Sequence, residues 1–289
     1  MVAFLFAHVQ YFCLYNELKK MKSTKILLIA SIILTLFAGC KKGGGLNIFT
    51  IEDDKNLGVQ AATEIANNPT EFPLLSKTTY VAKYNYINTI RDQILNSGVV
   101  QYKTDFDWDM NIIKNDSVLN AFCTPGGHIY VYTGLIKYLD NASSLAGVLG
   151  HEMAHADRRH STQQLTAVYG ISTLLSIALG QNYAQLQQMV TSLSSLQFSK
   201  EHEKEADAYS VKYLCATKYH AEGASYFFQK LEAGGYPCNG LQAFFSTHPC
   251  PDNRVTNITT DATTQNCSPN NNISVSEDVT DYNAFKTGL

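Results

Sequence analysis

Apolar residues recur at helical spacing in the first third of the chain. Segments 54–68 and 77–95 carry apolar side chains three or four positions apart, as Leu57, Ala61 and Ile65 show for the first segment. Residues at this spacing lie on one face of an α-helix, where they can pack against a core. The pattern therefore predicts two amphipathic helices.

Shorter apolar runs follow these two segments. Residues 109–114 contain Met110, Ile112 and Ile113, residues 121–123 read Ala-Phe-Cys, and residues 128–132 read His-Ile-Tyr-Val-Tyr. β-branched and aromatic residues in short runs are typical of strands. The Thr-Pro-Gly-Gly sequence at 124–127 is typical of a turn. We therefore expect a small sheet in this region.

Most of the remaining chain has a helical pattern. It extends from Gly134 to about Lys230, whereas 237–251 has the composition of a loop and 252–259 is long enough for one or two helical turns. Residues 165–179 are strongly apolar, but they are fewer than the roughly 18 that a membrane span needs, which favours a buried helix. The predicted fold class is α+β, mostly helical, with one small sheet.

The N-terminal region has the pattern of a secretion signal. Met21 begins a short basic segment, residues 26–38 are apolar or small, and Cys40 follows Ala-Gly. This order resembles a bacterial lipoprotein signal. We expect a signal peptide over 1–39 with its true start at Met21, a lipidated Cys40, and a flexible tether that completes 40–48. An uncleaved anchor with an incidental cysteine is the alternative.

Composition and charge exclude several classes of protein. The chain has 289 residues, 22 Lys and Arg against 25 Asp and Glu, a formal net charge of −3 and 45 % hydrophobic residues. This composition is globular, not fibrous or disordered. The balance of charge gives no basis for binding nucleic acid. We expect one domain over 49–260, followed by a polar, loosely ordered tail over 261–289.

Five of the seven cysteines lie beyond the tether: Cys123, Cys215, Cys238, Cys250 and Cys267. An oxidising compartment outside the cytoplasm favours disulfides, and an odd number leaves at least one thiol free. Spacing does not determine the pairing. Cys238 and Cys250 bracket one loop and are the first pair to consider, with two buried thiols as the alternative.

One motif carries a clear chemical signal. His151-Glu152-Met153-Ala154-His155 lies in a segment with a helical pattern. His151 and His155 are four positions apart and share one helix face, so they can hold one metal ion while Glu152 projects beside it. Two ordinary histidines on an amphipathic helix are the alternative.

A second acidic segment offers the ligand that this motif lacks. A catalytic zinc needs three protein ligands and one open position for water. In segment 199–207, Glu203 and Asp207 are four positions apart and share a helix face. One can bind the metal while the other accepts a hydrogen bond from a ligating histidine. Glu205 lies on another face and is expected not to be a ligand. A solvated helix face is the alternative.

Four motifs in the same order carry a resemblance to a known family. They are the segments 120–127, 151–155, 203–207 and 246–254. Together they resemble the superfamily of zinc metallopeptidases that includes HtpX, the CAAX prenyl proteases and BepA, and especially its small bacterial outer-membrane lipoproteins. One departure is Lys200, where that family commonly has Arg.

The resemblance implies a metal site and a mechanism. His151, His155 and Glu203 would hold one Zn²⁺ per chain, which lowers the pKa of a bound water. Glu152 would take a proton from that water and pass it to the leaving amine. Asp207 would orient His151.

The resemblance also implies a zincin-like fold. In this fold the edge strand of the small sheet borders the helix with the His-Glu-x-x-His (HExxH) motif of residues 151–155. Asn120, Ala121 and Phe122 would form that edge, on which an unfolded substrate adds as an extra strand. Backbone pairing of this kind tolerates many substrate sequences.

His248 lies in the last of the four motifs, and two catalytic roles are open for it. The motif resembles the segment that folds over the zinc in BepA-like relatives, so His248 would bind the fourth metal position as a latch, which is the role we prefer. Alternatively, it would donate a hydrogen bond to the oxyanion of the transition state, with Arg254 as a more distant donor.

These expectations combine into one function. The chain would be a zinc metalloendopeptidase that cleaves misfolded or misassembled proteins of the bacterial cell envelope, lipid-anchored at the periplasmic side of the outer membrane. Its partners would be such proteins and the membrane, and not nucleic acid. The alternatives are an envelope chaperone or assembly factor with a latent or inactive zinc site, and a structural zinc domain with a closed four-ligand site. Cys123 and Cys215 have no identifiable partner for nucleophilic catalysis.

Overall fold

A small sheet and the long helices around it position the residues singled out above. The structure is a computed structural model, and it describes residues 46–178, 183–235, 242–249, 253–267 and 273–289. The expected signal peptide, Cys40 and the start of the tether lie outside the described residues.

Three strands form the sheet in the order β1–β3–β2. They are β1 (Met110–Ile113), β2 (Ala121–Thr124) and β3 (His128–Tyr132). β1 runs parallel to β3, with Met110 opposite Ile129, whereas β2 runs antiparallel to β3, with Ala121 opposite Val131. β2 is therefore an edge strand of this sheet.

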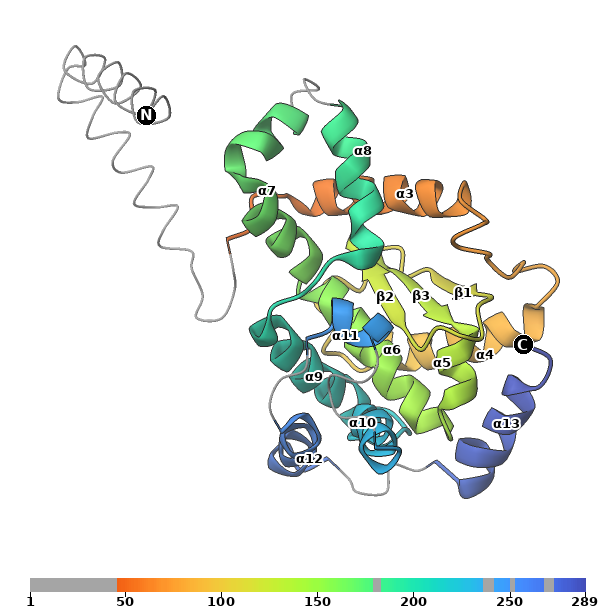
Figure 1. Ribbon diagram of the computed structural model, residues 1–289. Helices are drawn as coiled ribbons and strands as arrows, with labels where there is room; N and C mark the ends of the chain where they lie inside the picture. Colours follow the sequence, from red (N-terminus) through yellow and green to blue (C-terminus); the bar gives the residue numbers. More distant parts are fainter. Residues whose placement is uncertain (1–45, 179–182, 236–241, 250–252, 268–272) are drawn as a thin grey trace, which may run out of the picture. The chain divides into compact units, whose positions relative to one another are not determined.

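Helices surround this sheet (Figure 1). In chain order the α-helices are α3 (Ile51–Ala66), α4 (Val81–Leu95), α5 (Thr133–Tyr138), α6 (Ala142–Asp157), α7 (His160–Ala178), α8 (Tyr183–Ser192), α9 (Lys200–Cys215), α10 (Gly223–Ala233), α11 (Gln242–Thr247), α12 (Arg254–Thr264) and α13 (Asp281–Lys286). Shorter 3₁₀ turns are η1 (Pro125–Gly127) and η2 (Leu193–Ser195), and η3 (Ser276–Thr280) is a π-helical turn.

Helix α6 is the central helix of the fold. It packs against β2 and β3, α9 and α10, and every one of its residues is buried. Asn141 begins the helix by accepting a hydrogen bond from the backbone N–H of Ser144, which satisfies one of the donors that a helix start leaves free. A helix buried on all sides needs apolar or small residues all round, and the sequence Leu-Ala-Gly-Val-Leu-Gly supplies them.

Helix α9 crosses α6 and begins with a comparable cap. Ser199 accepts a hydrogen bond from the backbone N–H of His202, and Glu201 and Glu203 lie in the first turn. Acidic side chains are stabilised near a helix N-terminus by its partial positive charge. The mostly helical α+β fold, with an edge strand bordering the helix that carries His151 and His155, is confirmed.

The C-terminal region differs from the loosely ordered tail that we expected. Helix α12 extends beyond residue 260, and α13 follows with Tyr282 fully buried. The Tyr282 hydroxyl donates to the carbonyl of Ile136 at 2.6 Å, and Phe285 stacks on Tyr86 with 4.2 Å between ring centroids. A few aromatic anchors are enough to dock a polar segment, because each one buries a large apolar area.

Two further expectations concern the region of the C-terminal loop. Helix α11 lies within the segment 237–251 that we expected to be a loop, and Phe244 of that helix packs on Phe227 of α10. This contact is tertiary, and the local composition does not show it. The pair Cys238 and Cys250 lies outside the described residues.

The structure contains a disulfide that spacing did not indicate. Cys215, at the end of α9, is bonded to Cys267, just after α12, and their Cα atoms are 5.0 Å apart. Cys123 is a free, buried thiol. In the part of the chain that the structure describes, no helix combines the length and the apolar character required to cross a membrane. The apolar segment 165–179 belongs mainly to α7.

Candidate metal centre

Two imidazoles from α6 meet at the centre of the domain. His151 and His155 lie one turn apart on the same helix face, as their spacing predicts. Their Nε2 atoms are 3.0 Å apart, and both side chains are buried. Helix α6 therefore presents two candidate nitrogen ligands side by side.

Helix α9 adds a carboxylate to this pair. Glu203 Oε1 lies 3.3 Å from His155 Nε2, and Glu203 Oε2 lies 3.4 Å from His151 Nε2. Glu203 is fully buried. It comes from the first turn of α9, where the crossing with α6 brings the two helices together.

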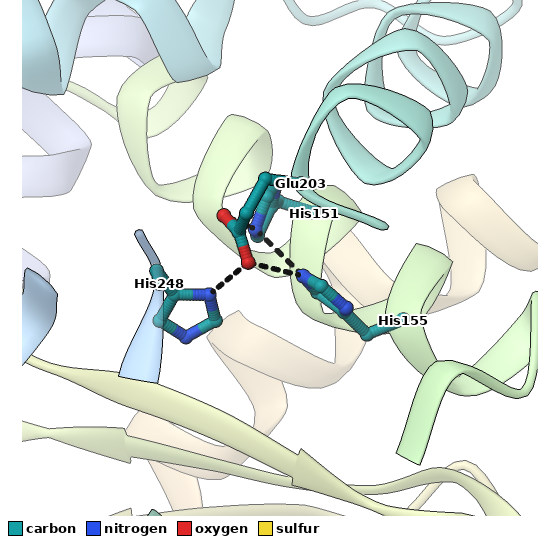
Figure 2. A group of neighbouring side chains, drawn as sticks. All are labelled: His151, His155, Glu203 and His248. Carbon is teal, nitrogen blue, oxygen red and sulfur yellow. Dashed lines mark hydrogen bonds and ion pairs between the residues drawn. The ribbon is translucent and has the colours of Figure 1, made fainter. Parts of the chain in front are cut away.

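A third imidazole approaches from the segment after α11. His248 Nδ1 is 3.1 Å from Glu203 Oε1, and the side chain is fully buried (Figure 2). One ligand atom from each of His151, His155, Glu203 and His248 lies within 4.8 Å of the others. Sequence spacing could not place His248 here, because nearly a hundred residues separate it from the HExxH motif.

These four side chains lie close enough together to hold one metal ion. Zinc–nitrogen bonds of about 2.0–2.1 Å imply ligand atoms roughly 3.3 Å apart in a tetrahedron. Four of the spacings within the group, between 3.0 and 3.4 Å, are close to this value, and one ligand atom from each residue lies within 4.8 Å of the others. Glu203 is fully buried, and its Oε2 also lies 3.0 Å from Arg254 Nη2, so the carboxylate is surrounded by groups that favour its ionised form.

Glu152 lies beside this group and is also fully buried. Neither of its carboxylate oxygens has a hydrogen-bond partner among the described residues, although His248 Nε2 is 3.5 Å from Oε1. Burial raises the pKa of Glu152. A carboxylate with a raised pKa is suited to accept and return a proton near neutral pH.

Asp207 supports the first histidine. Its Oδ1 lies 2.8 Å from His151 Nδ1, so the ring can donate there and direct Nε2 toward Glu203. Arg254 binds the same carboxylate with two hydrogen bonds, of 2.7 and 2.8 Å. Burial opposes ionisation, but the Arg254 charge and the contact with His151 outweigh it and lower the pKa of Asp207.

Arg254 contacts several residues of the site, whereas the sequence suggested only a distant role as an oxyanion donor. Besides binding Asp207, its Nη2 lies 3.0 Å from Glu203 Oε2, and the guanidinium covers the Phe228 ring at 4.2 Å. Its Nη1 is buried without a hydrogen-bond partner in the described part of the chain, and the side chain lines a small cavity beside His151 and Glu152. The oxyanion role stays a prediction.

The strand expected to bind substrate lies next to the same group. Ala121 and Phe122 are the first residues of β2, and Asn120 directly precedes it. Ala121 and Cys123 face the main core, whereas Phe122 stacks on Tyr130 at the opposite face of the sheet. The Ala121 carbonyl is 3.4 Å from His248 Nε2. The loop histidine therefore contacts the backbone of the edge strand.

Residues that sequence reasoning missed surround His155. The His155 ring stacks on Phe198 with 3.9 Å between centroids, and its Nδ1 is 3.0 Å from Nδ1 of His160. His160 is five positions from His155, a spacing that one helix face does not bring together. It reaches His155 because α6 ends at Asp157 and Arg159 turns the chain with a positive φ of 62°.

Comparison with known proteins gives the family. The sequence model of peptidase family M48 matches residues 82–262. The mitochondrial metalloendopeptidase OMA1 of Schizosaccharomyces pombe is 27 % identical over 176 residues, which cover 60 % of this chain and 51 % of that protein. The beta-barrel assembly-enhancing protease of Yersinia pestis is 29 % identical over 185 residues, which cover 59 % of this chain and 37 % of that protein.

A third relative shows the same partial coverage. Mitochondrial metalloendopeptidase OMA1 of Arabidopsis thaliana is 32 % identical over 147 residues, which cover 49 % of this chain and 29 % of that protein. The chain thus spans about half or less of the length of these relatives. The family match includes all four motifs, from the edge strand to the segment that holds His248 and Arg254. This chain belongs to peptidase family M48.

Proposed function

We propose that the chain is a zinc-dependent endopeptidase of the bacterial cell envelope that cleaves misfolded or misassembled proteins. The observation that carries this proposal is the buried Glu152 carboxylate. It has no hydrogen-bond partner among the described residues and lies beside a group of side chains that fits a metal ion. A purely structural metal site needs no such carboxylate.

The chain's own residues would divide the chemistry between them. When bound, the metal would act as a Lewis acid toward the scissile carbonyl and the attacking water. Glu152 would take a proton from that water and return it to the departing amine. His151, His155 and Glu203 would hold the metal, while Asp207 would keep the His151 ring in the orientation that presents Nε2.

Substrate binding is proposed at the side of β2 that does not pair with β3. Within the described residues β2 pairs with β3 on one side only, but its residues are buried and η2 packs against it, so this side would have to be uncovered before a further strand could pair there. A bound chain would run past Ala121, whose carbonyl lies close to His248. Recognition through backbone hydrogen bonds requires an unfolded segment, not a particular sequence.

Location in the envelope has three supports. The basic and apolar pattern that ends at Cys40 resembles a lipoprotein signal. The disulfide between Cys215 and Cys267 is typical of an oxidising compartment outside the cytoplasm. Bacterial relatives are named beta-barrel assembly-enhancing proteases.

A second function is favoured by one observation. His248 completes a group of four protein ligands, and a metal bound by all four has no position for water. A chaperone or assembly factor with a latent site would have this arrangement. The two functions differ in their need for Glu152, because a protease requires this carboxylate for cleavage and a chaperone does not.

Hydrolysis of unfolded casein separates the two. We expect the purified chain from Cys40 onward to cleave casein, a zinc chelator to abolish cleavage, and Glu152→Gln to lower the rate by roughly 10²–10⁴-fold with its zinc retained. Glu201→Gln, an exposed change on α9, is the matched control and should cleave normally. Absence of cleavage by both wild type and His248→Ala would support the chaperone.

A further inference from the structure

His155 has a hydrogen-bonding partner on the side that faces away from Glu203. Its Nε2 lies with the other candidate ligand atoms, and its Nδ1 is 3.0 Å from Nδ1 of His160. The two rings meet edge to face, with 5.0 Å between centroids and an angle of 77°. Both imidazoles are fully buried.

The contact continues from His160 toward the surface. His160 Nε2 is 3.4 Å from Glu205 Oε2, and the other oxygen of Glu205 accepts a hydrogen bond from Arg158 Nε at 2.8 Å. The Glu205 and Arg158 side chains are 26 % and 25 % exposed. His202 stacks on His160 with 4.4 Å between centroids and holds the ring in place.

The positions of the hydrogens follow from the ligand role of His155. A neutral imidazole has one N–H, so a His155 that gives Nε2 to a metal carries its hydrogen on Nδ1. That hydrogen can be donated only to an unprotonated Nδ1 of His160. A neutral His160 then carries its own hydrogen on Nε2, which faces the Glu205 carboxylate. One set of tautomers therefore satisfies both contacts, from His155 to His160 and from His160 to Glu205.

The other histidine of the motif has an equivalent support. His151 Nδ1 contacts Asp207, and Asp207 binds Arg254. In both cases the nitrogen opposite the ligand atom leads to a carboxylate that is itself bound by an arginine. The difference is that a second imidazole, His160, extends the distance from His155 to its carboxylate.

We propose that His160 and Glu205 are positioning residues that fix the tautomer and the orientation of His155 and thereby strengthen metal binding. This proposal rests on the proposed function, since it requires a metal held by His155. Loss of a partner of this kind typically lowers the metal affinity by roughly 10–100-fold. Glu205, which the sequence placed away from the ligand face, thus influences the metal without touching it.

Zinc affinity of the mature protein tests the proposal. The zinc dissociation constant is measured by competition with a chelator for the wild type, His160→Leu, Glu205→Ala and the matched control Glu201→Ala. We expect His160→Leu and Glu205→Ala to weaken binding by roughly 10–100-fold, and Glu201→Ala to bind like the wild type. His160→Asn keeps an acceptor near the position of Nδ1 and should regain part of the affinity that His160→Leu loses.

A second readout reports ligand geometry directly. Cobalt(II) bound in place of zinc should have a changed visible spectrum in His160→Leu and an unchanged one in Glu201→Ala. The proposal is overturned if the zinc dissociation constant of either test variant is within about threefold of that of Glu201→Ala, because a much larger loss of affinity is expected. If His160→Leu does not fold, the surface change Glu205→Ala decides alone. A wild type that binds no zinc would instead refute the proposed function.

Discussion

At the scale of single residues, His248 contacts three parts of the site at once. Its Nδ1 lies 3.1 Å from Glu203, and its Nε2 lies 3.5 Å from Glu152 and 3.4 Å from the Ala121 carbonyl. One imidazole thus reaches a candidate ligand, the candidate base and the edge strand. Such a side chain would exclude both water and substrate while it stays in place.

Replacement of His248 by alanine separates its two possible roles. We expect His248→Ala to raise the basal rate of casein cleavage with zinc retained, because it opens the fourth metal position and the edge of β2. A role as oxyanion donor predicts a decrease of about 10²-fold in turnover. Rates come from casein proteolysis and zinc from metal analysis. An unchanged rate would contradict both roles.

At the scale of elements, the site depends on a close crossing of α6 and α10. A Cβ on Gly147 would overlap backbone atoms of Gly223 and Ala224, and a Cβ on Gly223 would overlap the Ser143 carbonyl. The two glycines therefore allow the backbones of the helices to touch. Gly147 is one turn before His151, so a shift of α6 here moves a candidate metal ligand.

Gly147→Ala should destabilise the fold for this reason. Overpacking of a tight contact typically lowers the free energy of unfolding by about 1–3 kcal/mol. The measurement is the urea midpoint of unfolding, followed by circular dichroism. Val59→Ala, at an exposed position of α3, is the control and should change stability by less than about 0.5 kcal/mol. Equal stability of the two variants would show that α10 can move aside.

At the scale of the whole molecule, residues 46–289 form a compact unit with its own core. All the site residues discussed above belong to it. The C-terminal helix α13 and the disulfide at Cys267 connect the end of the chain to α4, α5 and α9. The proposed lipid anchor at Cys40 is therefore expected to determine where the domain is located, and not how it folds.

Cys40→Ala tests this separation of anchor and domain. We expect the variant to lack the lipid and to leave the membrane fraction, because the lipid is its proposed attachment. Casein cleavage per molecule should stay the same, since the core and the site lie after residue 45. Fractionation and mass spectrometry provide the measurements. A variant that stays with membranes would indicate an uncleaved anchor.

Local spacing was sufficient to predict part of the site. The pairs His151 and His155, and Glu203 and Asp207, each share a helix face because residues four apart do so in any α-helix. The three strands were predicted at nearly the observed bounds from short apolar runs. His248 and Arg254 were indicated only by a resemblance to known proteins, since neither has a local pattern that points to a metal.

By itself, then, the sequence determined most of the helices, the three strands and the two pairs of side chains that share a helix face, because each depends on neighbours within a few positions. Helices α11 and α13 were not predicted, since they depend on tertiary contacts. Only the tertiary structure decided which residues surround them. His160 reaches His155 through a left-handed turn at Arg159, and Cys215 pairs with Cys267 across 52 residues. Contacts of this kind depend on how helices cross and loops close, and these are properties of the packed core that no short segment records.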